Sequence, residues 1–87
     1  MGYDMVELDV QMSSDGVPIV FHDRTLMKAC GKSGRVADFR ATELESIRYL
    51  LGNDRILRLE TALESSRRLG VGVMLDLKVG QDSREFL

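Results

Sequence analysis

The sequence lacks several features that would each point to a particular class of protein. Its one cysteine, Cys30, leaves no partner for a disulfide within the chain. With 12 Lys and Arg against 14 Asp and Glu, the net charge of −2 offers no basic surface for nucleic acid. No apolar run reaches the roughly 20 residues of a membrane-spanning helix, and the first residues lack the basic and apolar regions of a signal peptide. We therefore expect no nucleic acid partner and no membrane span, and the cytoplasm is the favoured compartment.

The chain is also short for a protein that must bury a large core. Its 87 residues make one small domain, and a domain of that size buries about 60% of its unfolded surface, which leaves little stability to spare. The hydrophobic fraction of 44% is ordinary for a globular protein and excludes a wholly disordered chain. We predict a single unit over residues 1–87 without internal repeats.

The most informative pattern is an alternation of polar and apolar residues near the amino terminus. One side of the predicted strand carries Met5, Glu7, Asp9 and Gln11, and the other carries Val6, Leu8, Val10 and Met12. A second predicted strand covers residues 18–22. The connection between the two strands is too short for a parallel crossover, so the strands form an antiparallel hairpin, with Asp15-Gly16 as a two-residue turn.

The two-residue turn fixes which residues lie opposite each other. It pairs Asp9 with His22 and Val10 with Phe21, so that Glu7, Asp9 and His22 share one face. Carboxylates two residues apart on a strand suit a hard cation, and a neighbouring imidazole exchanges protons near neutral pH. The alternation is equally typical of a solvent-exposed hairpin face, so both interpretations stay open from the pattern alone.

Two helices are predicted in the second half of the chain. A capping box at Thr42 to Glu45 indicates the start of the first helix, and Gly52 indicates its end. The second helix is predicted over Arg58 to Leu69, with Gly70 after it. A polar loop is predicted over residues 24–40, and it does not contain a phosphate-binding motif.

Several motifs together resemble those of the glycerophosphodiester phosphodiesterase family. They follow one another in the family's order: Glu7-Leu8-Asp9-Val10, Ser14 to Val20, Phe21-His22-Asp23, Gly34 to Phe39, Thr42-Glu43-Leu44 and Leu75 to Lys78. The resemblance implies the α/β class and a (β/α)8 TIM-type barrel. This chain would supply a β-hairpin, two helices and one further parallel strand over Val71 to Val79, as a partial domain spanning residues 1–87.

The resemblance also implies an activity and a set of site residues. The family hydrolyses glycerophosphodiesters to an alcohol and glycerol 3-phosphate, as part of lipid metabolism, with a divalent cation, Mg²⁺ or Ca²⁺. The implied metal ligands are Glu7, Asp9 and Asp76, and the implied catalytic residues are His22, as acid or base, and Lys78, which neutralises phosphoryl charge. Polar groups at the carboxyl end of a barrel strand are typical of an active site, although Asp76 and Lys78 would also suit a plain ion pair.

The sequence departs from the family pattern in two places. Asp76 stands where the family has Glu, and the family's His-Arg-Gly motif is absent. We therefore expect an incomplete piece of the enzyme, inactive alone and prone to associate through open sheet edges. Two alternatives remain: a non-catalytic fragment or pseudoenzyme, and a related phospholipase-type barrel that acts on phosphoinositides or sphingomyelin.

Overall fold

The computed structural model describes residues 5–78 and shows a mixed sheet with helices beside it. Along the chain the elements are β1 (Met5–Met12), β2 (Pro18–Val20), α1 (Met27–Cys30), the 3-10 helix η1 (Val36–Asp38), α2 (Ala41–Glu45), β3 (Leu57–Arg58), α3 (Leu59–Leu69) and β4 (Gly72–Leu77). The strand order is β3-β2-β1-β4, with β4 parallel to β1 and the other pairs antiparallel. The predicted α/β class, hairpin and further parallel strand are confirmed.

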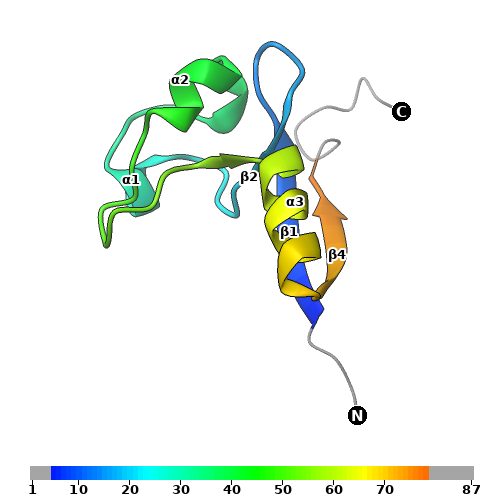
Figure 1. The fold of residues 1–87 in the computed structure, drawn as a ribbon. Coiled ribbons are helices and arrows are strands. Elements are labelled where there is room, and N and C mark those ends of the chain that lie inside the picture. The colour runs from blue at the N-terminus through cyan, green and yellow to red at the C-terminus, as the bar shows by residue number, and fades with distance from the viewer. Residues whose placement is uncertain (1–4, 79–87) are drawn as a thin grey trace.

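The two faces of the sheet are covered by different parts of the chain. In Figure 1, α3 lies over one face in front of β1, and it contacts β2, β3 and β4. Residues 24–56, which we call the lobe, carry α1, η1 and α2 and lie beside the hairpin in the same view. Side chains from the hairpin and the lobe form the main buried cluster: Ile19, Phe21, Leu26, Val36, Ala41, Leu44 and Ile56. No helix among residues 5–78 has the length and apolar character needed to cross a membrane.

The predicted hairpin register is wrong by one residue. Val10 pairs with Val20, and Gln11 pairs with Ile19. The loop has three residues rather than two, because the Ser13 N–H donates to Val17 O at 3.0 Å and the Gly16 N–H donates to Ser13 O at 3.0 Å. Only Gly16 in this loop has a positive φ, +80°, whereas a type I′ turn needs two such residues.

The physical reason for the error is that the hairpin has two apolar faces instead of one. Residues that pair directly across two strands point to the same side of a sheet. Ile19 therefore shares its side with Gln11 and is buried against the lobe, while Val10 is buried on the other side, outside that cluster. The predicted register assumed that one face of the hairpin is polar and the other apolar, whereas both faces carry buried apolar side chains.

The lobe differs most from the sequence-based prediction. It is more than a polar loop, because it contains α1 and η1 and fully buries Leu26 and Val36. The helix α2 ends at Glu45, well before Gly52, and its capping box joins the Arg40 N–H to Glu43 Oε1 at 2.8 Å. After α2 the chain turns toward α1, where the Leu50 N–H donates to Ala29 O, and Leu51 is left 91% exposed.

The last two elements agree better with the prediction. The helix α3 begins at Leu59, one residue later than predicted, and ends at Leu69 before Gly70, whose φ is +73°. The strand β4 ends at Leu77, and the predicted end at Val79 lies outside the described residues. Its side chains are not covered on both faces within residues 5–78, since Met74 is 55% and Leu77 60% exposed.

Candidate functional site

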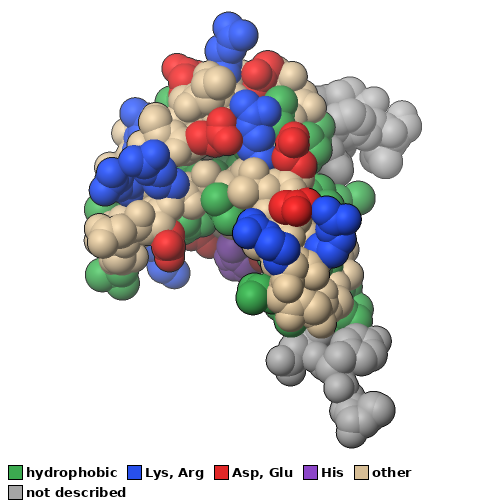
Figure 2. All heavy atoms as spheres, viewed as in Figure 1, with side chains coloured by type: hydrophobic (Ala, Val, Ile, Leu, Met, Phe, Trp, Pro, Cys, Tyr) green, Lys and Arg blue, Asp and Glu red, His purple; other side chains and the backbone are tan. Residues whose placement is uncertain are grey.

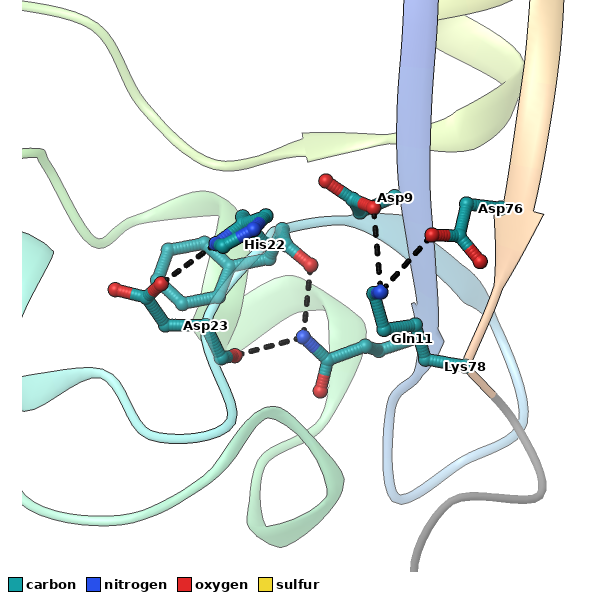
Figure 3. A network of polar contacts seen from close by, with 7 residues as sticks. Asp9, Gln11, His22, Asp23, Asp76 and Lys78 are labelled. Carbon is teal, nitrogen blue, oxygen red and sulfur yellow. Dashed lines mark hydrogen bonds and ion pairs between the residues drawn. The ribbon is translucent and has the colours of Figure 1, made fainter.

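The strands β1 and β4 bring two of the predicted site carboxylates together. Asp9 and Asp76 are direct partners in the parallel register, so their side chains lie on the same face of the sheet. Lys78 follows β4 directly and lies between them, with its Nζ 3.4 Å from Asp9 Oδ1 and 3.0 Å from Asp76 Oδ2 (Figure 3). The side chains of Asp9 and Lys78 are each only 19% exposed, so this ion pair is largely shielded from water.

The charges of this group support each other. The hydrogen bond from Lys78 holds the pKa of Asp76 below its usual value, and the attraction between the two groups adds to this effect. The same hydrogen bond raises the pKa of Lys78. Both side chains therefore keep their charges at neutral pH, and two carboxylates surround one ammonium group.

The predicted catalytic histidine lies just beyond β2. His22 Nδ1 is 2.8 Å from Asp23 Oδ1, and the imidazole is 77% exposed. The hydrogen bond to Asp23 raises the pKa of His22, and the negative charge of Asp9 raises it further. The predicted pairing of Asp9 with His22 across the hairpin is wrong, since the Phe21 N–H donates to Asp9 O at 3.0 Å and the strand has already ended. Asp9 and His22 nevertheless lie close enough for the charge of Asp9 to raise the pKa of the imidazole.

Glu7 stands apart from this group. It pairs with Met74 on β4, lies on the same side of β1 as Asp9, and is exposed. Residues 5–78 contain no set of three His, Cys, Asp or Glu side chains close enough to hold a metal ion. Asp9 and Asp76 offer two hard oxygen donors directed at one positive charge, which suits a hard cation, and Glu7 as a third ligand stays a prediction.

Two residues of the site were not singled out from the sequence. Gln11 Nε2 donates to Phe21 O and to Asp23 O, each at 2.7 Å, and Asp23 binds the imidazole of His22. Both had a weak signal, because Gln11 lies on the polar side of the predicted strand and Asp23 is adjacent to His22. Figure 2 shows positive and negative side chains interspersed over the face that carries α3, without a patch of one sign. The candidate site is therefore the group of charged side chains drawn in Figure 3.

Comparison with known proteins gives a consistent result. The chain is 30% identical over 81 residues to glycerophosphodiester phosphodiesterase 1 of Mus musculus, covering 84% of this chain and 24% of the mouse protein. It is 37% identical over 84 residues to a glycerophosphodiester phosphodiesterase of Arabidopsis thaliana, covering 88% of this chain and 26% of that protein. The chain thus spans about a quarter of the length of these relatives.

Solved structures agree with the sequences. A glycerophosphodiester phosphodiesterase of Agrobacterium tumefaciens superposes with a TM-score of 0.77 at 31% identity, over 85% of this chain and 34% of that one. A phosphodiesterase of Oleispira antarctica, in complex with the product sn-glycerol-3-phosphate, superposes with a TM-score of 0.81 at 30% identity, over 90% of this chain and 34% of that one. The structural neighbours are TIM-barrel enzymes, so the mixed sheet and its helices correspond to part of such a barrel. The sequence model of the glycerophosphoryl diester phosphodiesterase family matches residues 1–86, and the chain belongs to that family.

Proposed function

We propose that the protein containing this chain hydrolyses glycerophosphodiesters to an alcohol and glycerol 3-phosphate with the help of a divalent cation. The observation that carries the proposal is the placement of Asp9 and Asp76 on one face of adjacent parallel strands, with Lys78 between them and His22 within electrostatic reach. The product named for the Oleispira antarctica structure, sn-glycerol-3-phosphate, supports this substrate class. The small-molecule diester is the expected partner, and lipid metabolism is the expected setting.

The metal ligands proposed are Asp9 and Asp76, with Glu7 as the third. A bound Mg²⁺ or Ca²⁺ would supply positive charge that stabilises the negative charge developing on the phosphoryl oxygens. Asp76 is shorter by one methylene than the glutamate of the family motif, which favours contact through a water molecule over direct ligation. Lys78 lies between the two aspartates and adds a second positive charge toward the phosphoryl group.

His22 is proposed as the general acid. Its Nδ1 is engaged by Asp23, which leaves Nε2 to face the substrate. Because its pKa is raised, the imidazole is protonated to a larger extent near neutral pH than an ordinary histidine, and a proton is available for the leaving alkoxide. The chain contains no second histidine, so we expect the 87 residues alone to turn over glycerophosphocholine too slowly to detect.

A non-catalytic role is the second candidate, and one observation favours it. Lys78 already bridges Asp9 and Asp76, and no set of three metal-binding side chains is formed within the described part of the chain. In a pseudoenzyme the same group would serve only as an ion pair between β1 and β4. The two candidates differ in metal binding as well as in activity.

The experiment uses the full-length protein and a coupled assay for released glycerol 3-phosphate, with Mg²⁺, with Ca²⁺ and with a chelator. We expect turnover that needs the cation and that falls about 10² to 10⁴-fold in His22→Ala, the usual cost of losing a positioned acid. Calorimetry should show that Asp9→Asn abolishes metal binding. The matched control is Glu64→Gln, which removes a carboxylate from the exposed surface of α3.

Each outcome decides between the candidates. Unchanged turnover in His22→Ala would contradict the acid role, and unchanged metal affinity in Asp9→Asn would contradict the ligand role. Binding of neither cation by the full-length protein would favour the non-catalytic candidate. Asp76→Glu restores the longer carboxylate and should keep or tighten metal binding, so a large loss would exclude Asp76 from the metal site.

A further inference from the structure

We infer that Gln11 is a positioning residue, whose side-chain amide holds the backbone on both sides of His22 and so fixes where the imidazole lies. The inference rests on the proposed function in one respect, since it takes His22 to be the acid. It goes further because it assigns a role to a neutral side chain whose amide donates to backbone carbonyls. We call the amide and its two acceptors the Gln11 clamp.

The clamp consists of two short hydrogen bonds from a single nitrogen. Gln11 Nε2 donates to Phe21 O and Asp23 O, each at 2.7 Å, so both hydrogens of the amide group are used. These two carbonyls belong to the residues immediately before and after His22. Figure 3 shows the amide reaching from β1 to the segment that carries the imidazole.

The segment needs such a support because it lies outside regular structure. The strand β2 ends at Val20, and no ladder continues through His22. Backbone carbonyls that are shielded from water need a partner, and Gln11 supplies one to each of the two. Its own place is fixed, since it pairs with Ile19 within the ladder between β1 and β2. The hydrogen bonds of Gln11 therefore fix the backbone around His22 relative to β1.

The exposed imidazole depends on this support more than a buried one would. Its side chain is 77% exposed, so packing does little to restrict it, and its contact to Asp23 is made from the clamped segment itself. Phe21 anchors one end of the segment in the core, and the clamp holds the other end at Asp23. The charges that act on the imidazole include those of Asp23, Asp9 and Lys78, and Asp76 also interacts with it.

The chain offers a clean measurement because His22 is its only histidine. In the full 87-residue chain, imidazole ¹⁵N shifts report on the Nδ1 hydrogen bond and on the titration of His22 without interference. Gln11→Glu keeps the size but turns the donor into an acceptor facing two carbonyls. We expect this variant to lose the hydrogen-bond signature at Nδ1, while Gln11→Asn, which keeps both donors on a shorter side chain, recovers part of it.

The control and a catalytic readout complete the design. Asn53→Asp makes the same change from amide to carboxylate at an exposed loop position and should leave the His22 spectrum unchanged. In the full-length protein, Gln11→Glu should lower kcat about 10²-fold, the scale of a small misplacement of a catalytic group, with little change in KM.

The outcomes separate the inference from the proposed function. A Gln11→Glu chain that folds, by circular dichroism, and keeps the wild-type His22 spectrum would overturn the clamp. If that variant does not fold, Gln11→Asn decides instead, since a wild-type spectrum combined with a wild-type kcat at this shortened amide would also overturn it. If the spectrum changes as expected but the wild-type protein releases no glycerol 3-phosphate, the clamp stands and the proposed hydrolysis fails.

Discussion

Asp15 joins two parts of the chain that are distant in sequence. Its Oδ1 accepts a hydrogen bond from Ser13 Oγ at 2.6 Å and another from the Ala41 N–H at 2.9 Å, where α2 begins. The hydrogen bond from Ser13, followed by that from Ala41, lowers the pKa of Asp15 below its usual value. The carboxylate therefore ties the hairpin loop to the lobe in its charged form.

Acid should weaken this tie once the pH falls low enough to protonate Asp15 in the folded chain. A carboxylate with a lowered pKa in the folded state contributes stability above its unfolded pKa, and that contribution is lost as the pH falls through the folded value. We expect Asp15→Asn to lower the melting temperature at neutral pH, with the difference from wild type disappearing in strong acid. Thermal unfolding followed by circular dichroism across this range measures it. Asp54→Asn, in the exposed loop before β3, is the control, and a difference that persists at low pH would contradict the prediction.

For single residues, the sequence indicated the charged side chains of the candidate site but not its neutral hydrogen-bond donor. Asp9, Asp76 and Lys78 could be predicted to lie near each other, because the motif and the strand pattern place them on one face. Gln11 and Asp23 could not be assigned, since a glutamine on a polar strand face has no distinguishing pattern until its two acceptors are known. Which carbonyls Gln11 reaches depends on the hairpin register. That register places Ile19 against the side chains of the lobe, which a single segment of sequence does not reveal.

Among the connecting segments, two glycines with positive φ differ in their surroundings. Gly34 has φ +111°, and a Cβ there would lie 2.9 Å from Phe39 Cε2. Gly70 ends α3 with φ +73° and has no atom within 4 Å of the same position. Both conformations are strained for other residues, and only Gly34 also has a neighbour in the way.

The two alanine variants should therefore destabilise the chain unequally. Gly70→Ala should cost about 1 to 2 kcal/mol in the free energy of unfolding, the penalty of a left-handed backbone alone. Gly34→Ala should cost more, by roughly 1 to 3 kcal/mol, because the Phe39 ring packed against the core must shift. Urea denaturation of both variants measures the difference. Equal losses would mean that Phe39 moves aside freely.

Element by element, the sequence predicted what local signals determine. The ends of α3 follow from its apolar spacing and from Gly70, and both could be read from the sequence. The helix α2 was predicted too long, because Gly52 is a valid stop signal but the chain leaves the helix earlier to make the hydrogen bond between Leu50 and Ala29. A tertiary contact of this kind overrides local propensity and cannot be read from a single segment.

The molecule as a whole leaves apolar surface on the β4 side of the sheet. Within residues 5–78, β4 pairs only with β1, so its other edge carries unpaired backbone groups. Exposed apolar side chains accompany this edge: Met74, Leu75 and Leu77 on β4, and Met5 and Val6 on β1. The chain matches about a third of the solved Agrobacterium tumefaciens enzyme.

An open apolar edge favours pairing with another copy, so we expect the 87-residue chain expressed alone to associate as its concentration rises. Leu77→Lys places a charge at the end of β4 and should return the chain to a monomer, because a lysine on an edge strand would have to be buried in the contact. Light scattering after size-exclusion chromatography measures the mass. The matched control is Leu51→Lys, which adds the same charge to the lobe, at the 91% exposed leucine far from β4 in sequence. Dissociation by Leu51→Lys and not by Leu77→Lys would place the contact on the lobe instead. A wild-type chain that stays monomeric at all concentrations would show that the edge of β4 is already protected.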